Sequence, residues 1–255
     1  MNVIEDNPFR QAWVQLGQQF GDQGRWPRPR LILCISAHWT TQGWWLTAMP
    51  KPRTIHDFGG FPQALFEQQY PAPGDPVWAT RIAQAVHQPG TDQPLYLDAD
   101  DWGLDHGSWG VLKPMFPAAD IPVIQLSVDV QRSAADHYAL GQQLAALRDE
   151  GVLVVASGNT VHNLRTMQWS ATPDQAYPWT AEFDQWVADQ IGHGSPQRLC
   201  DFASLGETAR LAHPSIEHYL PLVVAAGASL GTDTPSFLND RYQGGSIAMR
   251  SVVWA

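Results

Sequence analysis

Short runs of consecutive apolar residues, separated by segments with helical spacing, constrain most strongly how this chain can fold. The runs cover residues 31–35, 122–127 and 152–156, and they are typical of strands buried on both faces of a sheet. A helix is predicted to begin after Ser133 and to end at Gly151. This alternation predicts an α/β fold, a single domain with a central mixed, largely parallel sheet flanked by helices.

Capping residues and apolar spacing predict the other elements. Asn7 followed by Pro8 indicates the start of a helix, and so does Asp75 followed by Pro76. Further helices are predicted at about 62–70, 109–116, 179–192 and 214–226, and further strands at 44–48, 95–97 and 246–254. The polar segments 166–178 and 229–245 are predicted loops and do not resemble domain linkers, so one domain is expected over residues 1–255.

Composition narrows the class of protein. With 44% hydrophobic and 16% charged residues among 255, a folded chain is favoured over a disordered one. The net charge of −10 argues against nucleic acid and against an anionic membrane surface as partners. No apolar run has the length of a membrane span, and the first residues lack the features of a signal peptide. We therefore expect a cytoplasmic protein, and the oligomeric state stays open.

The two cysteines are too few for a disulfide scaffold or a thiolate zinc cluster. Cys34 lies in an apolar run and is expected to be a buried thiol. Motifs of several other chemistries are missing from the sequence: a Gly-x-Ser-x-Gly nucleophile elbow, a Walker loop and a Gly-x-Gly-x-x-Gly fingerprint. The turn at 157–159 is either an ordinary turn or a cradle for an anionic oxygen.

Five of the nine histidines lie where ligands of α/β proteins bind, after predicted strands or in glycine- or aromatic-flanked segments. They are His38, His56, His106, His162 and His218. Neutral imidazole binds metals and also transfers protons near neutral pH. The residues alone leave two interpretations open, a metal site with proton-transfer residues beside it or a set of hydrogen-bonded structural histidines.

The remaining four histidines are expected to be solvated or to cap helices, because they fall on predicted helix surfaces or in polar loops. They are His87, His137, His193 and His213.

Six motifs occur along the chain in a fixed order. They are Ser36-Ala37-His38-Trp39, residues 55–62 (IHDFGGFP), 70–74 (YPAPG), 104–109 (LDHGSW), 157–164 (SGNTVHNL) and 217–222 (EHYLPL). Together they resemble the class III extradiol ring-cleavage dioxygenases, in particular the 4,5-DOPA dioxygenase-like branch. The resemblance runs from Met1 to about Trp254, which is essentially the whole chain.

The resemblance implies a non-haem Fe(II) enzyme, with Zn(II) able to occupy the same site. Such an enzyme binds a small catecholic substrate and O2 and opens the ring beside the hydroxyl groups, which requires open coordination positions on the metal. By motif position, the resemblance implies His38 and His218 as metal ligands. It implies His162 as a ligand or as an acid–base residue, and His106 beside Asp105 as the second proton-handling residue.

The same motifs imply residues that line or support the site. His56 would line or support it, and Asp57 is available to orient an imidazole. Trp39, Phe58 and Trp109 are candidate aromatic walls for a ring substrate, and ordinary core packing is the alternative reading of these three side chains.

His218 falls inside the predicted helix 214–226. Pro221 cannot donate a hydrogen bond to the carbonyl of Glu217, so a helix through this segment is expected to kink or loosen. Adjacent helical side chains diverge by about 100°, so His218 and Glu217 are not expected to bind one metal together.

One departure from the family concerns the start of the chain. Family members begin with a strand ending in Gly-His-Gly-Ser-Pro, followed by a segment like residues 1–7, so a strand and a ligand histidine precede Met1 in the family. The domain is therefore expected to be an extradiol dioxygenase-like domain that is N-terminally truncated relative to the family. One hypothesis is a longer gene product in which Met1 is internal. The other is a shortened, inactive or weakly active binding protein on an enzyme scaffold. A metal-dependent hydrolase is a third reading, which oxygen consumption distinguishes from a dioxygenase.

Overall fold

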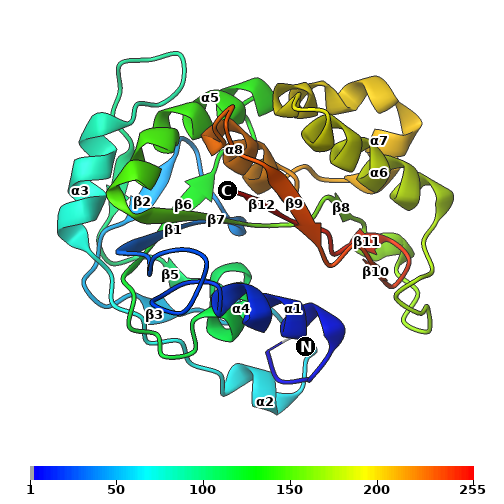
Figure 1. The fold of residues 1–255 in the computed structure, drawn as a ribbon, viewed down its shortest axis with the longest axis horizontal. Helices are drawn as coiled ribbons and strands as arrows, with labels where there is room; N and C mark the ends of the chain where they lie inside the picture. Colours follow the sequence, from blue (N-terminus) through cyan, green and yellow to red (C-terminus); the bar gives the residue numbers. More distant parts are fainter. Residues whose placement is uncertain (1–2) are drawn as a thin grey trace. The chain divides into compact units, whose positions relative to one another are not determined.

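The computed structural model describes residues 3–255, which form two compact units (Figure 1). Of the described residues, unit 1 comprises 3–131 and Ala146–Ser157, and unit 2 comprises Arg132–Ala145 and Gly158–Ala255. The α/β class with a mixed, largely parallel central sheet flanked by helices is confirmed. One domain over residues 1–255 stays a prediction. The expected N-terminal truncation concerns Met1, which lies outside the described residues.

Unit 1 is built on a five-stranded sheet with the order β4-β2-β6-β1-β7. Its strands are β1 (Leu31–Thr40), β2 (Trp45–Thr47), β4 (Tyr96–Asp98), β6 (Val123–Val128) and β7 (Val152–Ser157). β1 pairs in parallel with β6 and β7, β2 pairs in parallel with β4, and β2 pairs antiparallel with β6. Residues 31–37 of β1 are all buried, as expected for an inner strand.

β1 is longer than the predicted strand at 31–35. Its register against β6 shifts between Ile35 and Thr40, so the strand carries a bulge there. The sequence predicted His38 to follow the end of the strand. This position is wrong, because His38 lies within the irregular stretch of β1. A bulge bends a strand and changes the direction of the side chains that it carries.

Two further short strands of unit 1, β3 (Arg53–Thr54) and β5 (Gly103–Leu104), pair in parallel. The pairing continues one residue further, where the Ile55 N–H donates to the Leu104 carbonyl at 2.8 Å. Because the strands run in the same direction, the segments that follow them leave the pair at the same end.

The helices of unit 1 are α1 (Pro8–Gly17), α2 (Gln63–Phe66), α3 (Pro76–Ala85) and α4 (His106–Met115). The predicted N-caps are confirmed, since the Asn7 and Asp75 side chains accept hydrogen bonds from the first turns of α1 and α3. α4 begins three residues earlier than predicted, because Asp105 caps it by accepting the Ser108 N–H at 3.1 Å. α4 packs on β1, α1 packs on α4, and α3 packs on β2 and β4.

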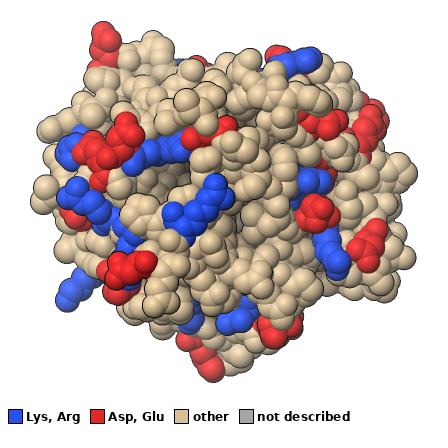
Figure 2. Space-filling view, viewed as in Figure 1, with Lys and Arg blue, Asp and Glu red and all other residues tan. Residues whose placement is uncertain are grey.

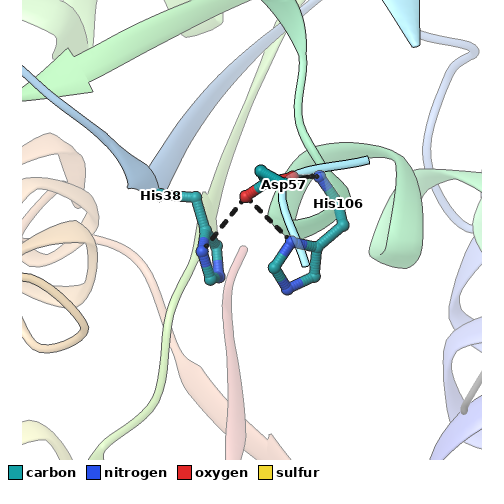
Figure 3. Close-up of side chains that lie close together, drawn as sticks. All are labelled: His38, Asp57 and His106. Carbon is teal, nitrogen blue, oxygen red and sulfur yellow. Dashed lines mark hydrogen bonds and ion pairs between the residues drawn. The ribbon is translucent and has the colours of Figure 1, made fainter. Parts of the chain in front are cut away.

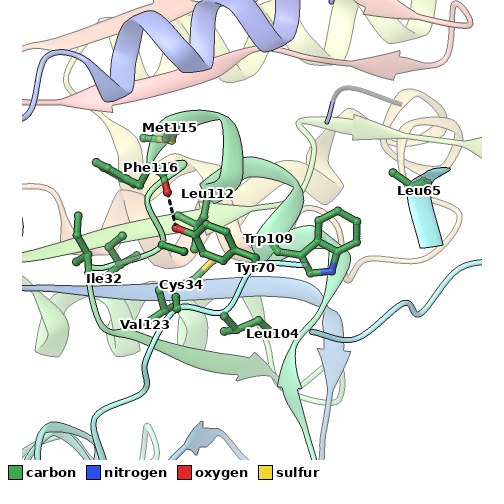
Figure 4. Packing of buried hydrophobic residues seen from close by; sticks show 13 residues of the cluster. Ile32, Cys34, Leu65, Tyr70, Leu104, Trp109, Leu112, Met115, Phe116 and Val123 are labelled. Carbon is green, nitrogen blue, oxygen red and sulfur yellow. Dashed lines mark hydrogen bonds between the residues drawn. The ribbon is translucent and has the colours of Figure 1, made fainter. Parts of the chain in front are cut away.

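The core between the sheet and α4 is apolar and closely packed (Figure 4). Ile32 and Cys34 of β1 are fully buried in it, together with Leu112 of α4. Burial raises the pKa of the Cys34 thiol to about 12, so the expected buried, protonated thiol is confirmed. This core holds α4 against β1 and thereby holds the first turn of α4 near the bulge.

Unit 2 contains helices and two small sheets. The helices are α5 (Ala134–Leu144), α6 (Pro178–Gly192), α7 (Glu207–Ala212) and α8 (Leu220–Ala228), with 3₁₀ segments at Leu164–Thr166 and Pro196–Leu205. A further 3₁₀ segment, Ala145–Glu150, follows α5 and lies almost wholly in unit 1. The strands are β8 (Val161–His162), β9 (Pro235–Leu238), β10 (Tyr242–Gln243), β11 (Ile247–Ala248) and β12 (Ser251–Trp254). One sheet has the order β10-β11-β8, and the other pairs β12 with β9.

Two predicted elements of unit 2 are wrong in extent. The strand expected at 246–254 is divided into β11 and β12, because Arg250 between them turns to an ion pair with the buried Asp184 at 2.8 Å. The helix expected at 214–226 begins only at Leu220, which places Pro221 in its first turn, where no backbone N–H is needed. His218 consequently lies in a turn before the helix.

Two histidines expected on the surface are buried. The Nδ1 atom of His137 lies 2.8 Å from the Ser133 carbonyl, and the Nε2 atom of His213 lies 2.8 Å from the Thr160 carbonyl. A backbone carbonyl thus satisfies one ring nitrogen in each case, which makes burial of the imidazole tolerable.

Charged side chains are scattered over the surface. Figure 2 shows basic and acidic groups next to one another on the visible face. Exposed ion pairs such as Arg28 with Asp120, 2.5 Å apart, also join opposite charges. The net charge of −10 is therefore not gathered in one area of that face. Among residues 3–255, no helix is both long and apolar enough to cross a membrane.

Close packing of α5 on α8 generates a first prediction. A Cβ atom on Gly141 would lie 2.0 Å from the Val224 carbonyl, so Gly141→Ala is expected to lower the free energy of unfolding by about 1–3 kcal/mol. Gly192→Ala is the matched control, because nothing lies within 4 Å of that Cβ position. Urea denaturation should show little change or a small gain for the control, and equal losses in both variants would contradict the prediction.

The buried His213 generates a second prediction. Burial lowers its pKa from 6.5 to about 4, the hydrogen bond to the Thr160 carbonyl opposes this shift, and His162 adds to it. The unfolded chain therefore takes up a proton at a higher pH than the folded chain does. This contribution to stability is complete above pH 6.5 and is lost as the pH falls towards 4.

Between pH 7 and pH 5, the free energy of unfolding should fall by about 2 kcal/mol more in the unmodified protein than in His213→Gln. Urea denaturation of both proteins at the two pH values measures this difference. Parallel pH dependence in the two proteins would rule out the neutral buried imidazole.

Candidate metal centre

His38, Asp57 and His106 lie together in unit 1 (Figure 3). The Asp57 Oδ2 atom is 2.9 Å from Nδ1 of His106 and 3.4 Å from Nδ1 of His38, and the two ring centroids are 3.9 Å apart. The bulge of β1 presents His38, whereas Asp57 and His106 follow the parallel strands β3 and β5. The three side chains are hereafter called the carboxylate–histidine cluster.

Asp57 holds the cluster together through both of its oxygens. Oδ1 accepts the backbone N–H of His106 at 2.9 Å, while Oδ2 faces the two imidazoles. Burial raises the pKa of Asp57, but the hydrogen bond from His106 and the charges of His106 and His38 lower it more, so the net shift is below the ordinary value. Asp57 is therefore an anion at neutral pH.

The position of Asp57 also selects a tautomer of its neighbours. Asp57 Oδ2, 2.9 Å away, is the acceptor that faces Nδ1 of His106. A carboxylate beside Nδ1 favours a proton on that atom, which leaves the lone pair on Nε2. In Figure 3 the second ring nitrogens of His38 and His106 point away from the carboxylate.

The chemistry of these donors fits a divalent metal ion. One ligand atom from each of the three side chains lies within 4.8 Å of the others. An imidazole nitrogen binds both Fe(II) and Zn²⁺, and a carboxylate beside the other ring nitrogen is the usual partner of a metal-bound histidine. The side chains of His38 and His106 are 24% and 33% exposed, so solutes reach them.

The Asp105 carboxylate does not join His106 in this cluster. It is fully buried and accepts hydrogen bonds from Ser36 and Trp102 side chains, at 2.7 and 3.3 Å, and from the Gln125 side chain and the Ser108 backbone. Asp57, which the sequence offered as a residue to orient an imidazole, stands beside the His106 ring. A catalytic role for Asp105 stays a prediction with no side-chain contact to support it.

His56 and Phe58 lie beside the cluster. The Nε2 atom of His56 is 2.9 Å from the Gln68 carbonyl, so this ring is held by the backbone and supports the neighbouring loop. The Phe58 ring meets His106 edge to face, with centroids 5.3 Å apart. Phe58 is thus the predicted aromatic residue that touches the cluster directly.

The two predicted tryptophans are packed in the interior. Trp109 is 1% exposed, and its Nε1 donates to the Ile55 carbonyl at 2.8 Å. Trp39 is 6% exposed and stacks on Trp102 with a centroid separation of 5.8 Å. Their contacts agree with core packing, and substrate binding by either one stays a prediction.

Unit 2 brings His162 and His218 together. Their rings are stacked, with centroids 3.5 Å apart and an angle of 6° between the planes. His162 is held on β8 by the pairing of that strand with β11, opposite Ile247. His218 lies in the turn before α8. Pro221 requires α8 to begin late, so this turn is not part of the helix.

Asn159, which the sequence singled out only as part of a turn, holds His218. Its backbone N–H donates to the His218 carbonyl at 2.9 Å, and its Oδ1 lies 3.3 Å from Nδ1 of His218. The Asn159 amide donates to the Ala248 carbonyl at 3.1 Å, which turns Oδ1 towards the imidazole. A Cβ on Gly158 would lie 2.2 Å from the His218 carbonyl, so this close turn requires glycine.

Sequence reasoning grouped His38, His162 and His218 as metal ligands. The structure places His162 with His218 in unit 2, and His38 with Asp57 and His106 in unit 1. Sequence reasoning missed Asn159, Ser36 and Gln125. The first two stand inside recognised motifs, but Gln125 is hidden in an apolar strand and carries no sequence signal.

Comparison with known proteins identifies the family. The family described as "Catalytic LigB subunit of aromatic ring-opening dioxygenase" matches residues 4–247. A protein of Escherichia coli (strain K12) named 4,5-DOPA dioxygenase extradiol is 44% identical over 99% of this chain and 90% of its own length. A protein of Beta vulgaris with the same name is 38% identical over 88% of this chain and 82% of its own length.

A solved structure agrees with these relatives. The crystal structure of an uncharacterized protein from Escherichia coli K12 matches with a TM-score of 0.80 and 39% identity, covering 98% of this chain and 93% of that one. The chain belongs to the LigB family of aromatic ring-opening dioxygenases. Its activity is extradiol opening of an aromatic ring, in a family that depends on a non-haem metal.

The shared carboxylate generates a third prediction. Asp57→Asn replaces an anionic acceptor with an amide whose nitrogen repels an Nδ1–H, so the affinity for Zn(II) should fall about 10–100-fold. Competition with a chelator measures the dissociation constant. Asp22→Asn, at an exposed carboxylate outside the groups that could hold a metal ion, is the control and should bind as the unmodified protein does. Equal affinities in all three proteins would contradict a role for Asp57 in the centre.

Proposed function

We propose that this protein opens the ring of a catechol of the DOPA type with O2, in its Fe(II) form, and that Zn(II) can occupy the same site. The observation that carries the proposal is the carboxylate–histidine cluster, two imidazoles that share one anionic carboxylate. The names of the relatives from Escherichia coli and Beta vulgaris support a DOPA-like substrate. A small aromatic substrate and O2 follow from the family, and the catecholic class is part of the proposal.

His38 and His106 have separate proposed roles. Nε2 of His38 is the proposed metal ligand, with Asp57 behind the ring to hold its orientation. When bound, the metal supplies Lewis acidity and open coordination positions. Nε2 of His106, whose lone pair Asp57 leaves available, is the proposed acceptor of a catechol hydroxyl proton. Phe58, edge-on to His106, is the proposed contact for the substrate ring.

The roles of His162 and His218 rest on the sequence motifs. We propose His218 as a metal ligand and His162 as a ligand or acid–base residue. Asn159 supports this reading for His218, because an acceptor at Nδ1 favours the tautomer with a lone pair on Nε2. Two expectations from the sequence stay predictions: that the protein binds neither nucleic acid nor membranes, and that it is cytoplasmic.

Anaerobic loading with Fe(II), followed by addition of L-DOPA, caffeate or protocatechuate in the presence of O2, tests the proposal. We expect uptake of one O2 per catechol consumed and a yellow ring-opened product, since extradiol cleavage incorporates both oxygen atoms. His106→Gln should lower kcat by about 100-fold or more, as expected for loss of a general base, while it retains bound metal.

The Zn(II)-loaded protein is the control and should take up no O2, because zinc has no redox chemistry. Loss of metal from His38→Ala, with retention in Phe58→Leu, would support the ligand assignment. Bound Fe(II) without O2 uptake on any of the three catechols would refute the proposed function. Turnover without O2 would favour the hydrolase.

A further inference from the structure

We propose that Asp105 is a positioning residue that holds His38 and His106 at their mutual distance, with Ser36 as its link to β1. The inference rests on the proposed function only in taking these two histidines as the reacting groups. It assigns Asp105 no part in proton transfer.

The surroundings of the Asp105 carboxylate carry the first step. This side chain is fully buried, and four neutral donors point at it. Oδ1 receives the Ser36 hydroxyl and the Ser108 N–H, and Oδ2 receives the side-chain N–H groups of Gln125 and Trp102. Because a buried carboxylate offers about four acceptor positions, this one has none left for the His106 ring.

Ser36 connects Asp105 to His38. The Ser36 hydroxyl donates to Asp105 Oδ1 at 2.7 Å, and Oγ of Ser36 also accepts the backbone N–H of His38 at 3.2 Å. This backbone N–H belongs to the bulge, where the regular ladder of β1 is interrupted. The hydroxyl therefore ties the bulge to Asp105.

Asp105 connects to His106 through the start of α4. Its side chain caps the helix at the Ser108 N–H, 3.1 Å away, and His106 is the first residue of that helix. Loss of an N-cap lets the first turn of a helix fray. The direction of the His106 side chain thus depends on the same carboxylate that anchors the bulge.

Two further contacts join the same segments. Trp102 donates to Asp105 and stacks on Trp39, the residue after His38, with an interplanar angle of 5°. A Cβ on Gly107 would lie 2.7 Å from Cδ2 of His38 and 2.6 Å from the Ser36 hydroxyl. The His38 ring therefore lies directly against the backbone of the first turn of α4, so a small movement of either segment changes the cluster.

The role of Asp105 follows from these contacts. Asp57 can face two Nδ1 atoms at once only if the two rings keep a centroid separation near 3.9 Å. The hydrogen bonds of the Asp105 carboxylate reach the backbone segments that carry both rings. Asp105 acts on the cluster through Ser36 and through the helix cap.

The test compares Ser36→Ala and Asp105→Asn. Ser36→Ala removes the link to the bulge and leaves the helix cap in place, so the dissociation constant for Zn(II) should rise about 10-fold. Asp105→Asn should raise it about 10–100-fold, the range for losses behind metal ligands. In the Fe(II) form both variants should lower kcat and keep both limbs of the pH profile of kcat/KM.

Ser127→Ala is the matched control. Ser127 is also a fully buried hydroxyl of the same sheet, but it bonds to Thr41 and to the Trp45 backbone outside this network. It should leave the Zn(II) affinity unchanged. Because Ser36 and Asp105 form one network, the double variant should bind Zn(II) no more weakly than Asp105→Asn alone.

Loss of one limb of the pH profile in Asp105→Asn, with unchanged Zn(II) affinity, would overturn the inference and assign proton transfer to Asp105. Equal affinities in Ser36→Ala and the unmodified protein would also overturn it. If Asp105→Asn does not fold, Ser36→Ala decides alone, because its helix cap is intact.

Imidazole NMR signals of the metal-free protein separate this inference from the proposed function. Ser36→Ala should shift the signals of His38 and leave those of His56 in place, since the Gln68 carbonyl holds His56. Should the unmodified protein take up no O2, the function fails, while the Zn(II) affinities and these signals still test the positioning role. Unshifted His38 signals would refute it.

Discussion

β1 is hydrogen-bonded on both sides, to β6 and to β7, and this double pairing is the constraint on which the rest of unit 1 depends. Buried backbone groups must be paired, so the strand cannot slide without losing two ladders at once. Its one irregularity, between Ile35 and Thr40, is therefore fixed in space. The side chain of His38 leaves the sheet from that irregularity. The apolar core under α4 holds this helix, which carries His106, against β1.

Two carboxylates near the site, Asp57 and Asp105, have different partners and different tasks. Asp57 follows β3 and faces imidazole nitrogens, so it controls which ring nitrogen carries a proton. Asp105 follows β5 and faces only neutral donors, so it controls where backbone segments lie. The parallel pairing of β3 with β5 brings both acids to the same end, and their different neighbours separate their tasks.

The α/β class, most strand and helix positions and the importance of His38 and His106 could be predicted, because apolar runs, caps and motif residues are local signals. That Asp57 faces the ring of His106, whereas Asp105 bonds to Gln125, could not, because Gln125 lies 20 positions from Asp105 and carries no local signal. The burial of His213 likewise depends on the Thr160 carbonyl, 53 positions away. At α8 the sequence was partly informative. Pro221 predicted a disturbed helix, but only packing decides that the helix begins late instead of kinking.

Gly107 has a consequence for reading related sequences. The His38 ring lies where any side chain at this position would stand, so the arrangement tolerates a hydrogen atom there and nothing larger. A relative that carries alanine or a bigger residue must hold its imidazole elsewhere, even if every histidine and carboxylate is retained. This single backbone position therefore separates chains that keep the arrangement from chains that have only its polar residues.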